Sequence, residues 1–166
     1  FPLVRVRMMY FKDYGDAMPG MWDADPLVAS NFFELPDKTS DFKTFVEPQV
    51  AGGGGDWAES GTECLNEAMD SDWIAVGDQP SGYSDKVTDV YPLIVVWTDA
   101  SAHPIPYANS IANPDYPAAN KMPRTYGEFL DKWNDKNVIP QEHKQILFFV
   151  DPAQDFGDGE TGWHEI

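Results

Sequence analysis

The sequence predicts an α/β fold with a mainly parallel central sheet. Two apolar runs, 92–99 and 145–151, have no polar alternation, which is typical of strands covered on both faces. Segments with the three-to-four-residue apolar spacing of helices lie before and between these runs. Strands that alternate with helices along a chain favour a parallel sheet, in which ligands bind beyond the carboxyl ends of the strands.

The first 50 residues predict one long strand and one helix. Residues 3–11 are rich in strand-forming residues and place valine, methionine and tyrosine on one face. Prolines and glycine predict an irregular segment over 17–39, with one short strand at most. A short helix begins at Ser40, because Phe42, Phe45 and Val46 then share one face.

A second helix is predicted from Asp56 to about Met69. Asp56 suits the N-cap position, and Glu59 follows at the spacing of a capping box. Cys64 lies on the apolar face of this helix, so we expect an inert core thiol. The following residues, 70–89, predict a loop with glycine and proline breakers.

The second half of the chain predicts a strand at 92–99, a long surface loop at 100–124, a helix and a last strand at 145–151. Thr125 and Glu128 have capping-box spacing. The helix that they open places these apolar residues on one face: Tyr126, Phe129, Leu130 and Trp133. We interpret residues 1–166 as a single domain with long loops at 17–39, 70–89 and 100–124.

Composition excludes some classes of partner. The formal net charge is −17, so nucleic acid and anionic membrane surfaces would be repelled, whereas divalent cations would be attracted. No apolar run reaches the roughly 20 residues of a membrane-spanning helix. A single cysteine excludes an internal disulfide. These features leave the compartment open.

Acidic residues follow the predicted strands at one edge of the sheet. Asp13, Asp99 and Asp151 each come after a strand, and Asp56 precedes a helix after four glycines. Aspartates from separate loops can supply the oxygen ligands that Mg²⁺ prefers. The sequence therefore predicts a divalent cation at this edge. The plainer alternatives stay open: Asp56 as a helix cap, Asp99 and Asp151 as turn residues, and the glycines as a linker.

Two segments resemble the middle of a von Willebrand factor A (VWA) domain: AGGGGDWAESGTECLNEAM (51–69) and YPLIVVWTDASAH (91–103). The subgroup that they resemble opens a helix with Gly-Gly-Gly-Asp-x-Pro-Glu and later ends a hydrophobic strand in Thr-Asp-Ala. Residues 4–16 are similar to its second strand, and 125–134 and 145–151 stand where the family has its later helix and strand. The resemblance covers roughly residues 3–151, with Ala58 in place of the usual proline.

The resemblance implies a Rossmann-like three-layer sandwich with a metal-ion-dependent adhesion site that holds Mg²⁺, or Mn²⁺ or Ca²⁺. It implies Asp56 and Asp99 as metal ligands. The candidates for positions around the ion or against a partner are Asp13, Glu59, Ser60, Thr98, Ser101 and His103. A partner's acidic group would complete the coordination of the ion.

One part of the family pattern is missing. The family's first strand ends in Asp-x-Ser-x-Ser, and no such motif precedes Leu3. The nearest match is Asp99-Ala-Ser101-Ala-His103, which leaves a rearranged order of motifs as an alternative. Without that strand the sheet is incomplete at the N-terminus, and unpaired edges invite pairing with another chain. We therefore expect another segment or chain to complete the sheet.

Three functions follow as hypotheses. The first is a protein-binding module, not an enzyme, that recognises an acidic group on a partner through a divalent cation. The second is a structural or assembly protein that keeps the VWA scaffold without a working metal site. The third is a metal-dependent hydrolase, for which the sequence offers no nucleophile motif and no convincing general base.

Overall fold

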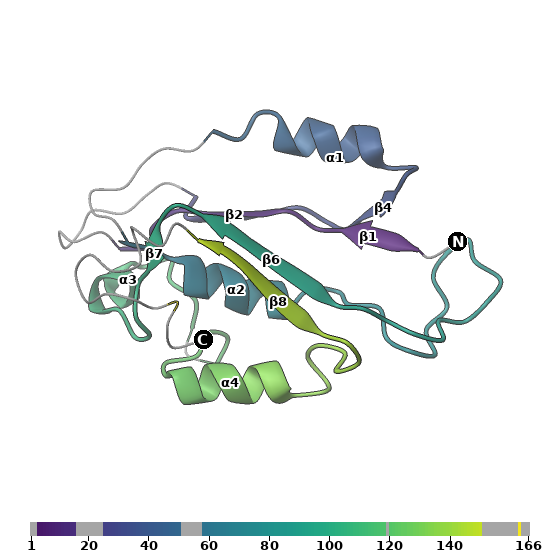
Figure 1. Ribbon diagram of the computed structural model, residues 1–166. Helices are drawn as coiled ribbons and strands as arrows, with labels where there is room; N and C mark the ends of the chain where they lie inside the picture. The colour runs from purple at the N-terminus through teal and green to yellow at the C-terminus, as the bar shows by residue number, and fades with distance from the viewer. Residues whose placement is uncertain (1–2, 16–24, 51–57, 119, 151–162, 164–166) are drawn as a thin grey trace.

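The computed structural model describes residues 3–15, 25–50, 58–118, 120–150 and 163. Figure 1 shows the order of the elements along the chain. The strands are β1 (Val4–Val6), β2 (Met9–Phe11), β3 (Leu27–Ala29), β4 (Phe33–Leu35), β5 (Ala58–Glu59), β6 (Leu93–Thr98), β7 (Ser101–Ala102) and β8 (Gln145–Val150). The helices are α1 (Thr39–Val46), α2 (Gly61–Met69), α3 (Ala108–Ala112) and α4 (Tyr126–Asn134).

The N-terminal strands form two antiparallel ladders. β1 pairs with β4 in the register Val4↔Leu35, and β2 pairs with β3 in the register Met9↔Ala29. The strand predicted at 3–11 is thus confirmed, with a break between β1 and β2. Two short strands, β3 and β4, lie in the described part of 17–39, where at most one was predicted.

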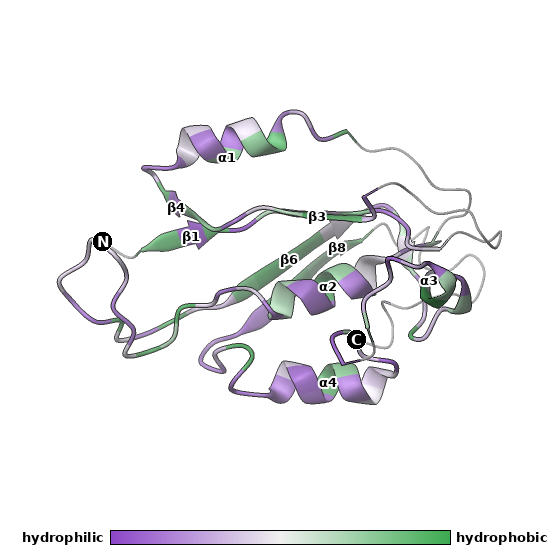
Figure 2. Cartoon of the chain, turned by 180° about the vertical axis from the view of Figure 1, so that it is seen from behind, coloured by the Kyte–Doolittle hydropathy of each residue, from purple (hydrophilic) through white to green (hydrophobic). Residues whose placement is uncertain are grey.

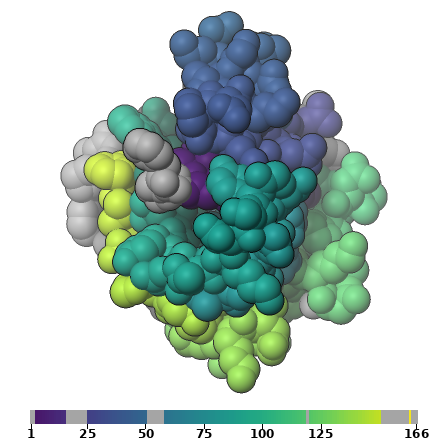
Figure 3. Space-filling model, turned by 90° about the vertical axis from the view of Figure 1, so that its right-hand side faces the viewer, coloured from purple at the N-terminus to yellow at the C-terminus, as the bar shows by residue number. Residues whose placement is uncertain are grey.

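The predicted α1 helix is confirmed and packs through its aromatic side chains. The ring of Phe42 meets that of Phe33 at 5.8 Å, and the ring of Phe45 meets that of Tyr10 at 5.9 Å. The helix has no fully buried residue. It therefore forms a blue lobe that projects from the body of the molecule (Figure 3).

The longest ladder joins β6 and β8 in parallel, from Leu93↔Gln145 to Thr98↔Val150. Figures 1 and 2 show α2 and α4 on the same side of this ladder. The core lies between the ladder and these helices and contains Leu65, Met69, Ile94, Val96, Ala102, Phe129, Ile139 and Trp163. Because β6 and β8 run in parallel, their carboxyl ends meet at one edge, near β7.

The predicted start of α2 is wrong. The helix begins at Gly61, with Ser60 at the N-cap position, and Glu59 lies in β5. A parallel pairing of β5 with β7 takes the chain into a strand where the capping-box pattern predicted the first helical turn. Asp56, the predicted cap, lies outside the described residues.

Three other expectations for the second half of the chain are corrected or refined. The interpretation of 100–124 as a surface loop is wrong in part, because β7 and α3 lie there and Ser101, Ala102 and His103 are buried. The interpretation of β6 and β8 as strands covered on both faces is also wrong, because alternate side chains of β6 are exposed and no residue of β8 is buried. At α4, Thr125 Oγ1 accepts the Glu128 amide as predicted, but the Glu128 carboxylate accepts from the Arg124 amide instead of from Thr125.

The predicted three-layer sandwich stays a prediction. Within the described ranges the strands form four two-stranded sheets, two antiparallel and two parallel, and not one continuous central sheet. No helix in this part of the chain is long and apolar enough to cross a membrane.

Candidate functional site

A buried polar network lies where β2, α2 and β7 meet. Asp13 follows β2, Ser60 precedes α2 and His103 follows β7. One oxygen of Asp13 accepts the Ser60 hydroxyl at 3.0 Å and the Gly15 amide at 3.2 Å. The other lies 3.0 Å from His103 Nε2. The network thus joins three segments that are remote in the sequence.

The backbone around this network is tied to the same side chains. Ser60 Oγ also accepts the Tyr14 amide at 2.9 Å, and the Ser60 amide donates to the Lys12 carbonyl at 3.1 Å. Gly15 packs so closely against α3 that an added Cβ would lie 2.2 Å from backbone atoms of Asn109 and Ser110. Only glycine fits there without moving the backbone.

The network suits a positioning role better than catalysis. Asp13 is 1% exposed and His103 is 0% exposed, and the imidazole is stacked on Tyr107 at 3.8 Å. The Ser60 hydroxyl donates to the Asp13 carboxylate. A substrate could not reach these atoms without displacing the packing around them.

A second buried carboxyl lies beside the network. Glu63 Oε1 accepts the Tyr116 hydroxyl at 2.8 Å, whereas Oε2 has no hydrogen-bond partner among the described residues. Burial raises the pKa of Glu63, against the opposing effect of the Tyr116 hydrogen bond. Burial also raises the pKa of the Cys64 thiol to about 12, as expected for an inert core thiol.

Asp99, a predicted metal ligand, lies on the surface at the carboxyl end of β6. Its side chain is exposed, next to a hollow of about 580 Å³ that is lined by Trp97, Thr98, Asp99, Phe149 and Val150. The Thr98 hydroxyl accepts the Ala100 amide at 3.0 Å and so shapes the turn after the strand. Asp99 is therefore open to an ion or a partner.

Asp56, the other predicted ligand, lies outside the described residues, as does Asp151. The pairing of β5 with β7 is nevertheless relevant to the predicted metal site at Asp56 and Asp99. Ala58 pairs in parallel with Ser101, and these residues follow Asp56 and Asp99 by two positions each. In the part of the chain that the structure describes, no three carboxylate, histidine or cysteine side chains gather as metal ligands.

The structure brings together part of the predicted set. Asp13, Ser60 and His103 form one network, and Glu59 and Ser101 flank it as members of the β5–β7 pair. Thr98 and Asp99 lie apart from the network, at the exposed end of β6. Sequence reasoning missed Glu63, Tyr116 and Asn113, whose amide donates to the Tyr14 carbonyl at 2.8 Å. No pattern in the sequence indicates that Glu63 is buried, because its helical neighbours three and four positions on are Asn66 and Glu67.

An apolar surface runs beside this site along β6 and β8, and we name it the open face. Its side chains alternate with the buried Ile94 and Val96. The members and their exposed fractions are Leu93 47%, Val95 50%, Trp97 81%, Leu147 43% and Phe149 54%. In the view of Figure 1 no helix lies in front of these two strands.

Comparison with protein-family models, with curated proteins and with solved structures finds no match to the chain.

Proposed function

We propose that this chain is a protein-binding module of the VWA type, with no catalytic role, and that a protein partner covers its open face. The exposure of that face carries the proposal. Five large apolar side chains from two paired strands form one surface, and such patches are typical of binding sites. Trp97 and Phe149 lie 5.6 Å apart, ring to ring, and provide an aromatic anchor of the kind that dominates interfaces.

The apolar pattern of β6 supports the same proposal. Its sequence is that of a strand covered on both faces, yet only Ile94 and Val96 are covered by the rest of the chain. A partner on the open face would supply the second cover.

Photo-crosslinking followed by reconstitution tests the proposal. A photoreactive residue at position 147 should capture a partner, and one at the matched control position 130 should not, because Leu130 is 41% exposed but lies on α4. With the purified partner, Trp97→Ala should weaken binding at least about 30-fold, or about 2 kcal/mol. Equal capture at both positions, or equal affinity of the variant, rejects the proposal.

A second candidate function is recognition through a divalent cation at Asp56 and Asp99. The pairing of Ala58 with Ser101 favours it, because this pairing brings the two segments that follow these aspartates side by side. Mg²⁺ would be held by carboxylate oxygens and water. The buried Asp13 already accepts Ser60, Gly15 and His103, so it would orient the edge and not ligate the ion.

Calorimetric titration with Mg²⁺ tests the cation. Binding should be lost in Asp56→Ala and in Asp99→Ala and kept in Asp131→Ala, which removes an exposed carboxylate from α4. No binding to the unaltered chain, or equal binding by all variants, rejects this candidate and leaves the open face unaffected.

A further inference from the structure

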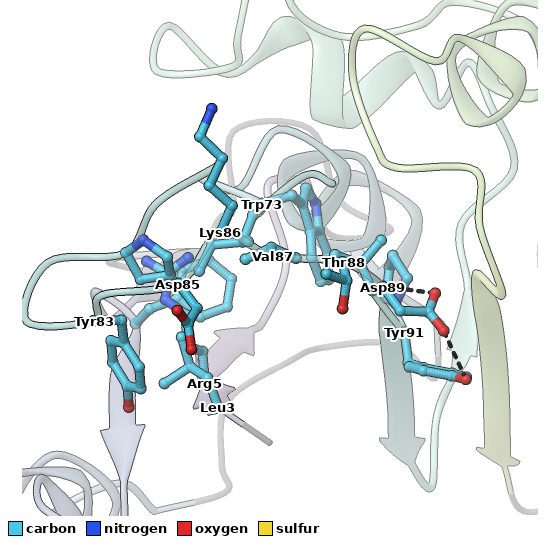
Figure 4. A pocket seen from close by; sticks show the side chains of 15 residues that line it. Leu3, Arg5, Trp73, Tyr83, Asp85, Lys86, Val87, Thr88, Asp89 and Tyr91 are labelled. Carbon is cyan, nitrogen blue, oxygen red and sulfur yellow. Dashed lines mark hydrogen bonds between the residues drawn. The ribbon is translucent and has the colours of Figure 1, made fainter. Parts of the chain in front are cut away.

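A cavity of about 500 Å³ separates β1 from the residues that lead into β6. Leu3 and Arg5 line it on one side, and Val90, Tyr91 and Pro92 line it on the other. Figure 4 shows Leu3 and Arg5 on one side and Tyr91 on the other, with Trp73 and Val87 between them. The cavity thus adjoins β1 on one side, and most of its lining comes from the loop residues 73–92 that precede β6.

Among the described residues, β1 and β6 each have one unpaired edge. In this part of the chain, β1 is paired only with β4, and β6 only with β8. Figures 1 and 2 both show the order β4, β1, β6, β8 across the molecule, so the spare edges of β1 and β6 face each other. Each edge presents backbone N–H and C=O groups that can pair with an added strand.

Arg5 lines the cavity, and its guanidinium is held by the chain itself. Nη1 donates to the Asp72 carbonyl at 3.0 Å, and the group lies 4.4 Å from the Phe32 ring centroid. Its Nε is buried and has no hydrogen-bond partner among the described residues, so this atom is shielded from an occupant of the cavity.

We propose that an extended, uncharged segment of a partner polypeptide inserts as a β-strand between β1 and β6, through this cavity, and continues the open face. The inference rests on the proposed function. An uncharged strand suits the edge of β6, because β6 has no charged residue. The charged residues of the cavity lining are Arg5 of β1 and the loop residues Asp85, Lys86 and Asp89. A second copy of the folded chain does not fit, because each of its described strands already has one edge paired, whereas the inserted strand needs two free edges.

A set of peptides tests the insertion. The probe is a synthetic peptide of about ten residues, a typical upper strand length, with alternating valine and threonine and terminal lysines for solubility. Two matched versions carry N-methyl groups at the odd or at the even positions, and each therefore lacks the donors of one edge. The parent peptide should bind and slow amide hydrogen exchange in both β1 and β6. Either methylated version should bind more than about tenfold more weakly.

Other outcomes overturn the inference. If only one methylated version loses affinity, the peptide adds to a single edge. If neither does, the peptide only covers apolar surface, and if the chain forms dimers that the peptide does not dissociate, a second copy is the occupant.

Different results would reject the proposed binding module and the proposed strand insertion. If the parent peptide does not bind but Trp97→Ala still weakens the reconstituted complex, strand insertion is wrong and the binding module stands. If Trp97→Ala leaves that complex unchanged, the proposed function is wrong whatever the peptides do.

Discussion

The polar network and the open face are two adjoining regions with opposite departures from the usual pattern of burial. At the carboxyl-end edge, a carboxylate, an imidazole and a hydroxyl are excluded from solvent. Along β6 and β8, large apolar side chains are exposed. Buried polar groups and exposed apolar patches are the informative exceptions in a protein. The first exception is resolved inside the chain by hydrogen bonds, whereas the second is the surface that we propose a partner covers.

We expect the largest loss of stability when the carboxylate of Asp13, at the centre of the polar network, is removed. Asp13→Ala leaves the Ser60 hydroxyl, the Gly15 amide and the His103 ring without their buried acceptor. We expect the free energy of unfolding to fall by about 3–5 kcal/mol. Urea denaturation measures the loss. Asp99→Ala is the control, because this exposed carboxylate should contribute less than about 0.5 kcal/mol. Equal effects would show that the network does not stabilise the fold.

Two neighbouring valines of β6 allow the buried side of this strand to be compared directly with the open face. Val96 is buried and Val95 is half exposed, and threonine has nearly the shape of valine. Val96→Thr buries a hydroxyl and should cost about 1–3 kcal/mol of stability. Val95→Thr should cost less than about 0.5 kcal/mol, since water can solvate the hydroxyl. Thermal unfolding of both variants checks this difference. A large loss at Val95 would mean that the open face is already covered in the free chain.

The smallest expected effect concerns Glu63, at the margin of the polar network. Burial raises its pKa, so the folded state holds this proton more tightly than the unfolded state. Stability is therefore greatest below the ordinary value of 4.5 and falls as the pH rises through the raised pKa of the folded state. Glu63→Gln keeps an acceptor for Tyr116 and removes the charge. It should stabilise the chain at neutral pH but not below the ordinary value, as measured by urea denaturation across pH. A gain that does not depend on pH would contradict this account.

Sequence patterns predicted those elements that depend on local periodicity. β6, β8, α1 and α4 lie close to their predicted positions because apolar spacing and the Thr125 cap specify them locally. β5 and β7 were missed because their pairing joins residues far apart in the sequence, such as Ala58 and Ser101. Periodicity also cannot distinguish a strand covered by its own chain from one covered by a partner.

The candidate site was predictable in composition and not in geometry. Asp13 was a candidate because it follows a predicted strand, and Ser60 and His103 were candidates through the resemblance to the VWA family. Their mutual hydrogen bonds and their complete burial were not predictable, since both depend on tertiary packing. Asp99 was predicted beside Asp56, and the structure describes only Asp99.

The contact between Asp13 and His103 also constrains how the protein folds during synthesis, because the two residues are 90 positions apart. At the usual speed of a ribosome, His103 follows Asp13 by roughly 5–18 s. Throughout that interval the nascent chain holds a solvated carboxylate and the edges of β1 and β2, with no imidazole to close the edge. Chaperones or an early-binding partner would meet the chain before this contact is made, and the pairing of β8 with β6 comes later still.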